Sequence, residues 1–282
     1  MDVNISSFLN WSQNQLTDAG VPSPGLDSEI ILAHTLNISR TDLWMQNQRM
    51  LSESEIKDVK KCMERRLNRE PISQIVGHQE FWSLDFIVDE NVLAPRPETE
   101  LLIETALNCI SSPTAKILDL GTGSGALAVT MAKEISECKV SAIDIDPKAL
   151  NIAKENSERH GVINRIKFIC ADLRTSDWSG CFSLILSNPP YIKSEDIEKI
   201  MPEVRNYEPW KALDGGVTGL DFYRSIIPMA VDRLEENGFL ILEIGHDQAD
   251  DVTALLNNFS CDQNIKVIQD YSGYDRVVKA QK

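Results

Sequence analysis

The second half of the chain alternates short apolar strands with helical stretches, and this alternation restricts the fold more than any other feature. Such an order places successive strands parallel in one sheet. Two later apolar runs are separated by too few residues for a crossover helix, so we expect them to be antiparallel. Helical segments are predicted after each of the first four strands, and the predicted strands are 116–120, 140–144, 166–170, 182–186, 239–243, 265–268 and 276–280. The predicted fold is α/β, with a doubly wound sheet and an antiparallel C-terminal hairpin.

The N-terminal part of the chain has helical periodicity instead. Apolar residues recur three and four positions apart from Ile5 onward. Ser52 and Glu55 form an S-x-x-E capping box before another helix, and Pro71 ends that pattern. Short β-rich runs then predict a hairpin. The expected organisation is a small helical domain over residues 1–75, a β-hairpin linker over 76–96 and the sheet domain over 97–282.

The charge of the chain disfavours non-specific binding to nucleic acids. The sequence has 28 Lys and Arg against 43 Asp and Glu, a formal net charge of -15. Such a surface repels a phosphate backbone unless basic side chains are concentrated in one place. The one locally basic stretch, Lys57–Arg69, has helical spacing and is interrupted by Asp58 and Glu64. It is typical of a solvated helix face, and a partner-docking face is the alternative.

The cysteines and the apolar runs bear on metal binding and location. The six cysteines form no C-x-x-C pair and lie mostly inside apolar runs, which predicts reduced, buried thiols and no metal site. No run reaches the 18 or so apolar residues that a membrane span needs, and the N-terminus does not resemble a signal peptide. We therefore expect a cytoplasmic protein without a membrane partner.

A glycine-rich turn follows the first predicted strand. The chain reads Asp-Leu-Gly-Thr-Gly-Ser-Gly from Asp119 to Gly125, where a strand gives way to a helix. Glycines let the backbone approach a ligand closely at the carboxyl edge of a parallel sheet. The spacing is not that of a P-loop, and no lysine follows to hold a phosphate. The turn indicates a nucleoside site and disfavours a nucleoside triphosphate.

Asp144 ends the second predicted strand, about 20 residues after the glycines. An acid at this place can accept hydrogen bonds from both hydroxyls of a ribose. The alternative role is to cap the helix that begins at Pro147, but Asp146 stands directly before that proline. We therefore expect Asp146 to be the cap and Asp144 to bind ribose.

Asn188-Pro189-Pro190-Tyr191, at the end of the fourth predicted strand, is the most specific motif. Two prolines restrict the backbone, so the side-chain oxygen of Asn188 and the carbonyl of Pro189 can accept the two N–H bonds of a planar NH₂ group. Tyr191 can lie against that group. The alternative is a rigid turn, which requires neither the asparagine nor the aromatic residue. The motif favours an amine or amide substrate.

The glycine turn and this motif together resemble the S-adenosylmethionine (AdoMet)-dependent methyltransferases that act on nitrogen. Further motifs narrow the resemblance to the protein-(glutamine-N5) methyltransferases of the PrmC/HemK family, which have a Rossmann-like sheet. The resemblance spans residues 71–280 and rests on Gly77–Trp82, Val92–Glu100, Glu208–Pro209, Ala212–Leu213, Gly215–Gly216, Gly219–Asp221 and Leu242–Gly245. It implies that AdoMet methylates the glutamine in the Gly-Gly-Gln loop of class-I peptide-chain release factors, leaving S-adenosylhomocysteine, and that the helical domain docks this substrate.

The resemblance also implies roles for single residues on the cofactor side. The turn would wrap the methionine part of AdoMet, Asp144 would hold the ribose, and the two residues after the third strand would hold the adenine. Leu173 departs from the aromatic residue of some members, which implies aliphatic packing of the adenine. The implied cofactor residues are Gly121, Thr122, Gly123, Ser124, Gly125, Asp144, Asp172, Leu173 and Asn188.

On the substrate side, the resemblance makes Asn188, Pro189 and Tyr191 the catalytic residues. Asn188 and Pro189 would grip the glutamine amide, and Tyr191 and Phe81 would wall the slot. For Arg96 and Glu98 the alternative is an exposed ion-pair cluster of little net effect. The implied substrate-binding residues are Asn188, Pro189, Pro190, Tyr191, Phe81, Arg96 and Glu98.

An amide nitrogen is a poor nucleophile, because its lone pair is delocalised into the carbonyl. Two carbonyl acceptors orient the nitrogen toward the methyl group and stabilise the positive charge that develops on it. No Ser/His/Asp or Cys/His set lies near the motif in the sequence, which favours direct transfer of the methyl group. The group that accepts the released proton is not identified by the sequence.

Three other functions stay open. A glutamine methyltransferase of a ribosomal protein would share every catalytic motif. An adenine-N6 methyltransferase could use the same motif on a flipped base, but the net charge argues against it. A non-catalytic AdoMet-binding module would have no use for the intact Asn-Pro-Pro-Tyr motif. The expected partners are release factors, without direct contact to nucleic acid, and a monomer is the default state.

Overall fold

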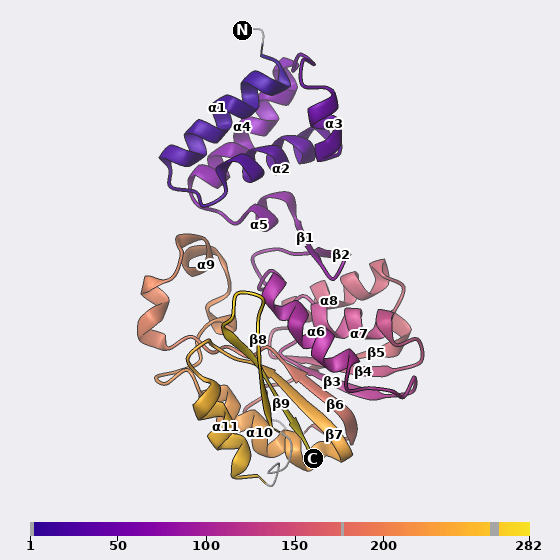
Figure 1. Cartoon of the computed structure of the whole chain (residues 1–282). Coiled ribbons are helices and arrows are strands. Elements are labelled where there is room, and N and C mark those ends of the chain that lie inside the picture. The colour runs from indigo at the N-terminus through magenta and orange to yellow at the C-terminus, as the bar shows by residue number, and fades with distance from the viewer. Residues whose placement is uncertain (1–2, 176–177, 260–264) are drawn as a thin grey trace. The chain divides into compact units, whose positions relative to one another are not determined.

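The computed structural model describes residues 3–175, 178–259 and 265–282. The chain forms two compact units (Figure 1). The helical unit consists of Met1–His78 together with Met201–Tyr207, and the sheet unit consists of Gln79–Ile200 and Glu208–Lys282. The chain therefore leaves the sheet unit after Ile200, contributes one short segment to the helical unit, and returns at Glu208.

The helical unit has its own apolar core. Its helices are α1 (Ile5–Asp18), α2 (Pro24–Leu36), α3 (Arg40–Met45), α4 (Glu53–Leu67), α5 (Ile72–Val76) and α9 (Pro202–Tyr207). Fully buried side chains such as Ile5, Ile31 and Met63 meet at the centre of this unit. The predicted capping box is confirmed: Ser52 Oγ accepts a hydrogen bond from the Glu55 amide, and Glu55 accepts one from the Ser52 amide at 2.8 Å.

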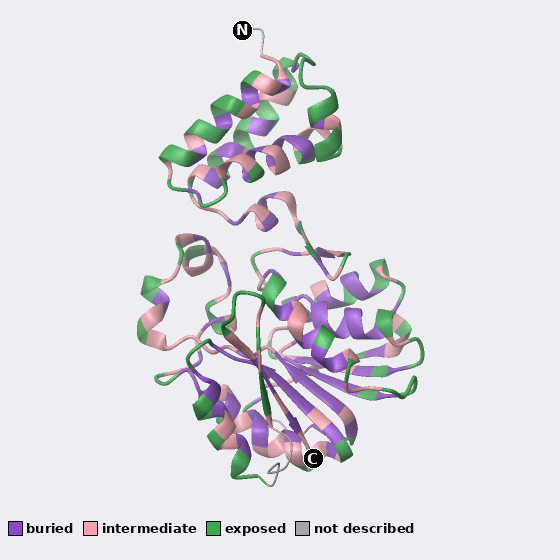
Figure 2. Ribbon diagram, viewed as in Figure 1, coloured by how far each residue is buried: buried purple, intermediate pink, exposed green. Residues whose placement is uncertain are grey.

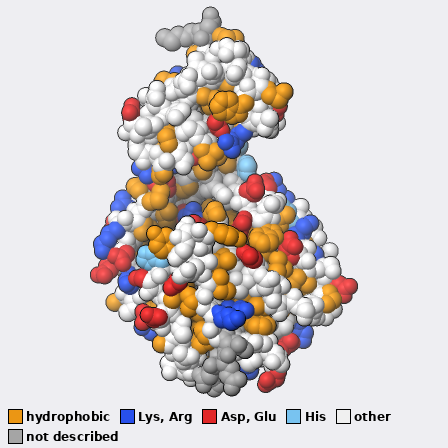
Figure 3. Space-filling view, in the orientation of Figure 1, with side chains coloured by type: hydrophobic (Ala, Val, Ile, Leu, Met, Phe, Trp, Pro, Cys, Tyr) orange, Lys and Arg blue, Asp and Glu red, His pale blue; other side chains and the backbone are white. Residues whose placement is uncertain are grey.

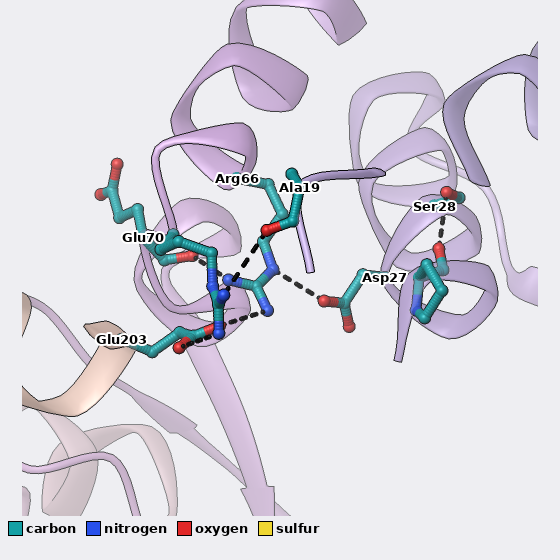
Figure 4. Close-up of polar contacts among 8 residues, drawn as sticks. Ala19, Asp27, Ser28, Arg66, Glu70 and Glu203 are labelled. Atoms are coloured by element: carbon teal, nitrogen blue, oxygen red, sulfur yellow. Dashed lines mark hydrogen bonds and ion pairs between the residues drawn. The ribbon is translucent and has the colours of Figure 1, made fainter. Parts of the chain in front are cut away.

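A buried ionic cluster holds α9 within this unit (Figure 4). Glu203 of α9 accepts hydrogen bonds from Arg69 Nε and Nη2, both at 2.7 Å, and from Arg66 Nη2 at 3.1 Å. Arg66 Nε donates to Asp27 at 2.7 Å. Only 4% of Arg66 and 6% of Glu203 is exposed, so both charges depend on these partners.

The interpretation of Lys57–Arg69 as a solvated helix face is therefore wrong for its C-terminal end. Arg66 is buried, and Arg65 donates to Glu70 and to backbone carbonyl groups of Gln74 and Ile75. Spacing alone missed this because the acidic partner of Arg66 and Arg69, Glu203, lies more than a hundred positions away in the sequence. Lys61, by contrast, makes an exposed ion pair with Asp58.

The sheet unit begins with a two-stranded sheet and continues with a seven-stranded one (Figure 1). The strands are β1 (His78–Phe81), β2 (Leu84–Ile87), β3 (Lys116–Leu120), β4 (Lys139–Asp144), β5 (Ile166–Cys170), β6 (Phe182–Ser187), β7 (Leu234–Glu243), β8 (Lys266–Gln269) and β9 (Asp275–Gln281). The α-helices of this unit are α6 (Glu100–Leu107), α7 (Ala126–Glu134), α8 (Pro147–Arg159), α10 (Asp221–Arg233) and α11 (Ala249–Asn257). The 3₁₀ turns among the described residues of this unit are η1 (Pro97–Thr99), η2 (Ile163–Arg165), η3 (Ser194–Lys199) and η4 (Trp210–Ala212).

The strand order of the large sheet is β5-β4-β3-β6-β7-β9-β8. The five strands from β3 to β7 are parallel, and β9 pairs antiparallel with both β7 and β8. The predicted α/β fold with an antiparallel C-terminal hairpin is confirmed. Because β4 and β6 lie on opposite sides of β3, the chain reverses its direction of winding there, and a crevice opens at the carboxyl ends of these strands.

Helices cover both faces of the sheet, as the buried layers in Figure 2 show. Ile117 packs with α6 and α7 on one face, whereas the next residue, Leu118, packs with α10 and α11 on the other. This alternation follows from the two-residue period of a strand. Both faces are therefore apolar, and polar side chains that meet ligands collect at the strand ends.

Two details of the predicted strand and helix pattern are wrong. No helix follows β5 in the described residues between Cys170 and Phe182 (176 and 177 are outside them); the Asp172 carboxylate instead accepts a hydrogen bond from the Arg174 amide and makes a turn. The predicted strand at 239–243 starts earlier, at Leu234. The sequence did not predict this extension, because Gly238 and the polar residues before it interrupt the apolar pattern of the strand.

Most of the described cysteines are not buried, contrary to the prediction. All five are free thiols, but only Cys138 is buried. Cys170, the last residue of β5, and Cys181, directly before β6, are exposed. Cys261 lies outside the described residues. No helix among the described residues is long and apolar enough to cross a membrane.

Candidate functional site

The carboxyl ends of β3, β4 and β6 meet at the reversal point of the sheet. The turn after β3 is fixed to β4 by two hydrogen bonds, in which the amides of Gly121 and Thr122 donate to the Ile143 carbonyl at 2.9 Å. Strand β6 carries Asn188 directly after its last residue. The topology therefore brings the glycine turn, Asp144 and the Asn-Pro-Pro-Tyr motif to one edge of the sheet.

The glycines of the turn differ in what they permit. Gly123 has a φ of 54°, and a Cβ built on it meets no atom within 4 Å, so its outer side is open to a ligand. A Cβ on Gly125 would lie 3.0 Å from the Cβ of Ala153 in α8. Gly125 thus allows close packing of helices. The side chains of Thr122 and Ser124 are buried behind the turn.

Asp144 holds the turn in shape and faces the same crevice. Its carboxylate accepts hydrogen bonds from the Gly123 amide and the Asp146 amide, both at 2.9 Å. Burial raises the pKa of Asp144 above its ordinary value, although these amide donors oppose the shift. Asp146 accepts from the Lys148 amide and caps α8, as the sequence predicts. Each carboxylate oxygen of Asp144 keeps a lone pair for a further donor.

Asp119, at the end of β3, is a buried acid with one free oxygen. Its Oδ2 accepts from the Thr122 hydroxyl at 2.6 Å and from the Ala128 amide at 3.1 Å. Its Oδ1 has no hydrogen-bond partner among the described residues. Burial raises the pKa of Asp119 to about 7. A buried carboxyl with an unsatisfied oxygen favours a cationic ligand group nearby.

A cavity of about 310 Å³ opens at this edge. Six of the sequence-predicted cofactor residues line it: Gly121, Gly123, Asp144, Asp172, Leu173 and Asn188. Thr122, Ser124 and Gly125 do not belong to the lining. Several other lining residues were not predicted as site residues, and they come from helices and loops far apart in the chain: Val92, Ile145, Ala149, Pro209, Trp210 and Phe222.

The lining fits a nucleoside that carries a positive charge. Asp144 in the lining and Asp119, which is buried at the end of β3, disfavour an anionic group such as a pyrophosphate. The open side of Gly123 leaves room for backbone contact, and Leu173, which is 5% exposed, supplies an apolar wall beside Gly121. AdoMet has a ribose, an apolar ring face and a sulfonium cation, and the residues present therefore fit it.

The Asn-Pro-Pro-Tyr motif is held by polar contacts on several sides. Asn188 Nδ2 donates to Thr99 Oγ1 at 3.1 Å. The Gln248 side chain donates to the Tyr191 carbonyl at 3.0 Å. The Tyr191 hydroxyl donates to Glu243 Oε1 at 3.3 Å. Asn188 and Pro190 line the cavity, Pro189 is buried, and Tyr191 packs partly buried beside them.

Glu243, the last residue of β7, is the buried acid behind this motif. It is 2% exposed and accepts from the Thr99 hydroxyl at 2.7 Å as well as from Tyr191. Burial raises the pKa of Glu243 to about 7, against the effect of the Thr99 hydrogen bond and of Arg276. Burial likewise raises the pKa of Tyr191, so its hydroxyl stays protonated. Thr99 and Glu243 lie within the motifs that carry the family resemblance, but the sequence predicts no role for either residue.

The other predicted substrate residues lie outside the cavity lining. Phe81 is 1% exposed and packs against Phe86, with ring centroids 6.1 Å apart, in the core. Arg96 donates to the buried carboxylate of Glu208 at 2.6 Å, and Glu98 is exposed. Asp172 is in the lining, but its carboxylate is paired with Arg174, and these hydrogen bonds lower the pKa of Asp172.

Comparisons with known proteins identify the family and the fold of the chain. A family model described as "PrmC N-terminal domain" matches residues 7–77, and one described as "Methyltransferase small domain" matches residues 97–204. A solved methyltransferase structure from Pyrococcus furiosus has a TM-score of 0.52 at 19% identity and covers 79% of this chain and 98% of its own. At that identity the likeness shows the fold alone.

Two curated relatives extend the match over nearly the whole chain. A release factor glutamine methyltransferase from Geobacter sulfurreducens is 39% identical over 275 residues, which are 97% of this chain and 95% of the relative. One from Agrobacterium fabrum is 37% identical over 288 residues, 98% of this chain and 97% of the relative. The resemblance inferred from the motifs is confirmed, and the chain belongs to the family of release factor glutamine methyltransferases.

Proposed function

We propose that this protein transfers a methyl group from AdoMet to the side-chain nitrogen of the glutamine in the Gly-Gly-Gln motif of class-I peptide-chain release factors. One observation carries the proposal: Asn188 lines the same cavity as Gly121, Gly123 and Asp144. An amide acceptor therefore lies directly beside the site that fits the methyl donor. A nucleoside-binding module without catalysis has no need of this arrangement.

AdoMet supplies an electrophilic methyl group on a sulfonium ion. The residues of this chain orient the acceptor nitrogen toward it. Asn188 directs its Nδ2 to Thr99, so its Oδ1 is the atom left to accept a substrate N–H. The Pro189 carbonyl would accept the other N–H, because the two prolines restrict the backbone that presents this oxygen. Two acceptors align the nitrogen and stabilise the charge that develops on it.

The proposal places the substrate on the helical unit and the reaction at the sheet unit, with AdoMet bound by the glycine turn, Asp144, Asp172 and Leu173. Arg96, Glu98, Phe81 and Tyr191 remain proposed substrate residues. The relatives' names support a release factor as the substrate. The cytoplasmic location and the monomeric state expected from the sequence belong to the same proposal.

A nucleic-acid substrate has less support. The formal net charge is -15, and on the face drawn in Figure 3 acidic and basic side chains are interspersed. A phosphate backbone binds best to a surface that gathers basic side chains. Methylation of a glutamine in a ribosomal protein would use the same chemistry as methylation of a release factor. The experiment therefore includes ribosomal proteins as substrates.

The test is methyl transfer from labelled AdoMet to a purified class-I release factor. Parallel reactions contain the factor with its Gly-Gly-Gln glutamine changed to alanine, ribosomal proteins, and duplex DNA. We expect label on the wild-type factor alone, with mass spectrometry locating it on that glutamine. Label on ribosomal protein or DNA alone would agree with AdoMet as the methyl donor but would refute the release factor as the substrate.

Two variants test the assigned roles. Asn188→Ala should lower kcat by about 100-fold or more, the usual effect of removing one oriented polar group, while the Kd for AdoMet stays nearly unchanged. Asp144→Ala should weaken AdoMet binding instead. Asn151→Ala, at an exposed asparagine of α8, is the matched control and should change neither. Equal loss of AdoMet binding in the first two variants would contradict these roles.

A further inference from the structure

The Asn188 amide has two ends, and methyl transfer needs a particular one of them to face the substrate. If Oδ1 faces the substrate, it accepts an N–H. If Nδ2 faces it, two donors meet and the glutamine amide is repelled. The two orientations have almost the same shape, so packing does not choose between them. A hydrogen-bond partner of defined direction must make the choice.

The structure contains such a partner behind Asn188. Thr99 precedes α6, and its Oγ1 lies 3.1 Å from the Asn188 side-chain nitrogen and 2.7 Å from Glu243 Oε2. A hydroxyl has one proton. When that proton is donated to the carboxylate, Thr99 can only accept from Asn188, and the end that faces it must be the NH₂ group.

Water does not compete with these contacts. Thr99 is 5% exposed and Glu243 is 2% exposed. The second carboxylate oxygen of Glu243 accepts from the Tyr191 hydroxyl, and the backbone carbonyl of Glu243 accepts from the buried Tyr223 hydroxyl at 2.8 Å. Glu243 thus binds Tyr191, at one end of the catalytic motif, directly, and it is linked to Asn188, at the other end, through Thr99.

We propose that Thr99 and Glu243 are positioning residues, a relay that turns the Asn188 amide so that its oxygen faces the substrate. Neither residue lines the cavity, so both act through Asn188 and Tyr191. The relay rests on the proposed function, since it explains how that function obtains its acceptor. It also accounts for a buried carboxyl group at the end of β7, where an apolar residue would pack without the cost of burying a polar group.

The decisive variant is Thr99→Val, which keeps the branched shape and removes the hydroxyl. We expect kcat for methyl transfer to the release factor to fall by about 10- to 100-fold, the size of a lost orienting contact, with the Kd for AdoMet unchanged. Thr99→Ser keeps the hydroxyl, and its kcat should be within about threefold of the wild-type value. Thr130→Val is the matched control, because Thr130 is buried in α7 and its hydroxyl has no partner among the described residues.

A second readout does not depend on the substrate. In protein labelled with ¹⁵N-asparagine, the Asn188 side-chain NH₂ signal is identified by its loss in Asn188→Ala. Its hydrogen exchange should be slow in the wild type and in Thr99→Ser, and fast in Thr99→Val. Glu243→Gln offers a donor as well as an acceptor to Thr99, so it should also speed this exchange and lower kcat, and it serves if Thr99→Val fails to fold.

Three results would overturn the relay: full activity of Thr99→Val, no rescue by Thr99→Ser, or unchanged exchange of the Asn188 amide in Thr99→Val. Failure of the wild type to methylate the release factor would instead refute the proposed function. In that case the exchange measurement still decides whether Thr99 orients Asn188.

Discussion

Removal of Glu203 should loosen α9 from the helical unit. The Glu203 carboxylate accepts three hydrogen bonds, two from Arg69 and one from Arg66. In Glu203→Ala, Arg66 keeps Asp27 as a partner, whereas Arg69 loses its carboxylate and has side-chain exposure of 22% through which to regain water. Breaking a buried pair costs about 3–5 kcal/mol, and this partial rescue lowers our expectation to about 2–4 kcal/mol.

The expected loss depends on pH. Burial opposes ionisation of Glu203, but the hydrogen bond from Arg69 and the nearby positive charges hold its pKa below its ordinary value. A carboxyl with a lowered pKa stabilises the folded state above its unfolded pKa, and this contribution disappears as the pH falls through the folded value. The difference in stability between wild type and Glu203→Ala should therefore be largest near neutral pH and shrink below about pH 4.5.

Hydrogen exchange followed by mass spectrometry is the appropriate assay, because two units need not unfold in one step. Peptides from α9 and from α4 should exchange faster in Glu203→Ala at neutral pH. Asp58→Ala removes an exposed ion pair with Lys61 and is the control, with an expected effect below about 1 kcal/mol. A change in α9 no larger than that of the control would refute the reasoning.

Two further predictions concern the sheet unit. Gly125→Ala should lower the free energy of unfolding in urea by about 1–3 kcal/mol, because φ is 82° there and the new Cβ would press on Ala153. Gly161→Ala, at a φ of 70° with no atom within 4 Å of its Cβ, is the control and should lose less stability. Equal losses of stability in the two variants would contradict the packing argument. Burial raises the pKa of Glu243 to about 7, so its protonated form favours folding and wild-type stability should fall as pH rises from about 4.5 to 7. Glu243→Gln should remove up to about 3 kcal/mol of that fall, and parallel pH curves for the two proteins would show that Glu243 is ionised throughout.

The sequence by itself determined the elements and the motifs. The strands at 116–120 and 166–170 have the predicted bounds, because continuous apolar runs between turn residues leave little choice of secondary structure. The capping box at Ser52 and the cap at Asp146 depend on residues within three positions, and both were predicted correctly. Local interactions of this kind can be read from neighbouring residues.

Tertiary structure decided which distant polar groups become partners. Thr99 and Glu243 are separated by 144 positions, and Arg66 and Glu203 by 137, so no local pattern indicates either contact. The loop after β6 brings Pro209 and Trp210 to the cavity in the same way. A buried charge is stable only beside its partner. That partner is set by the packing of whole elements, whereas the strand, helix and turn signals are set within a few residues.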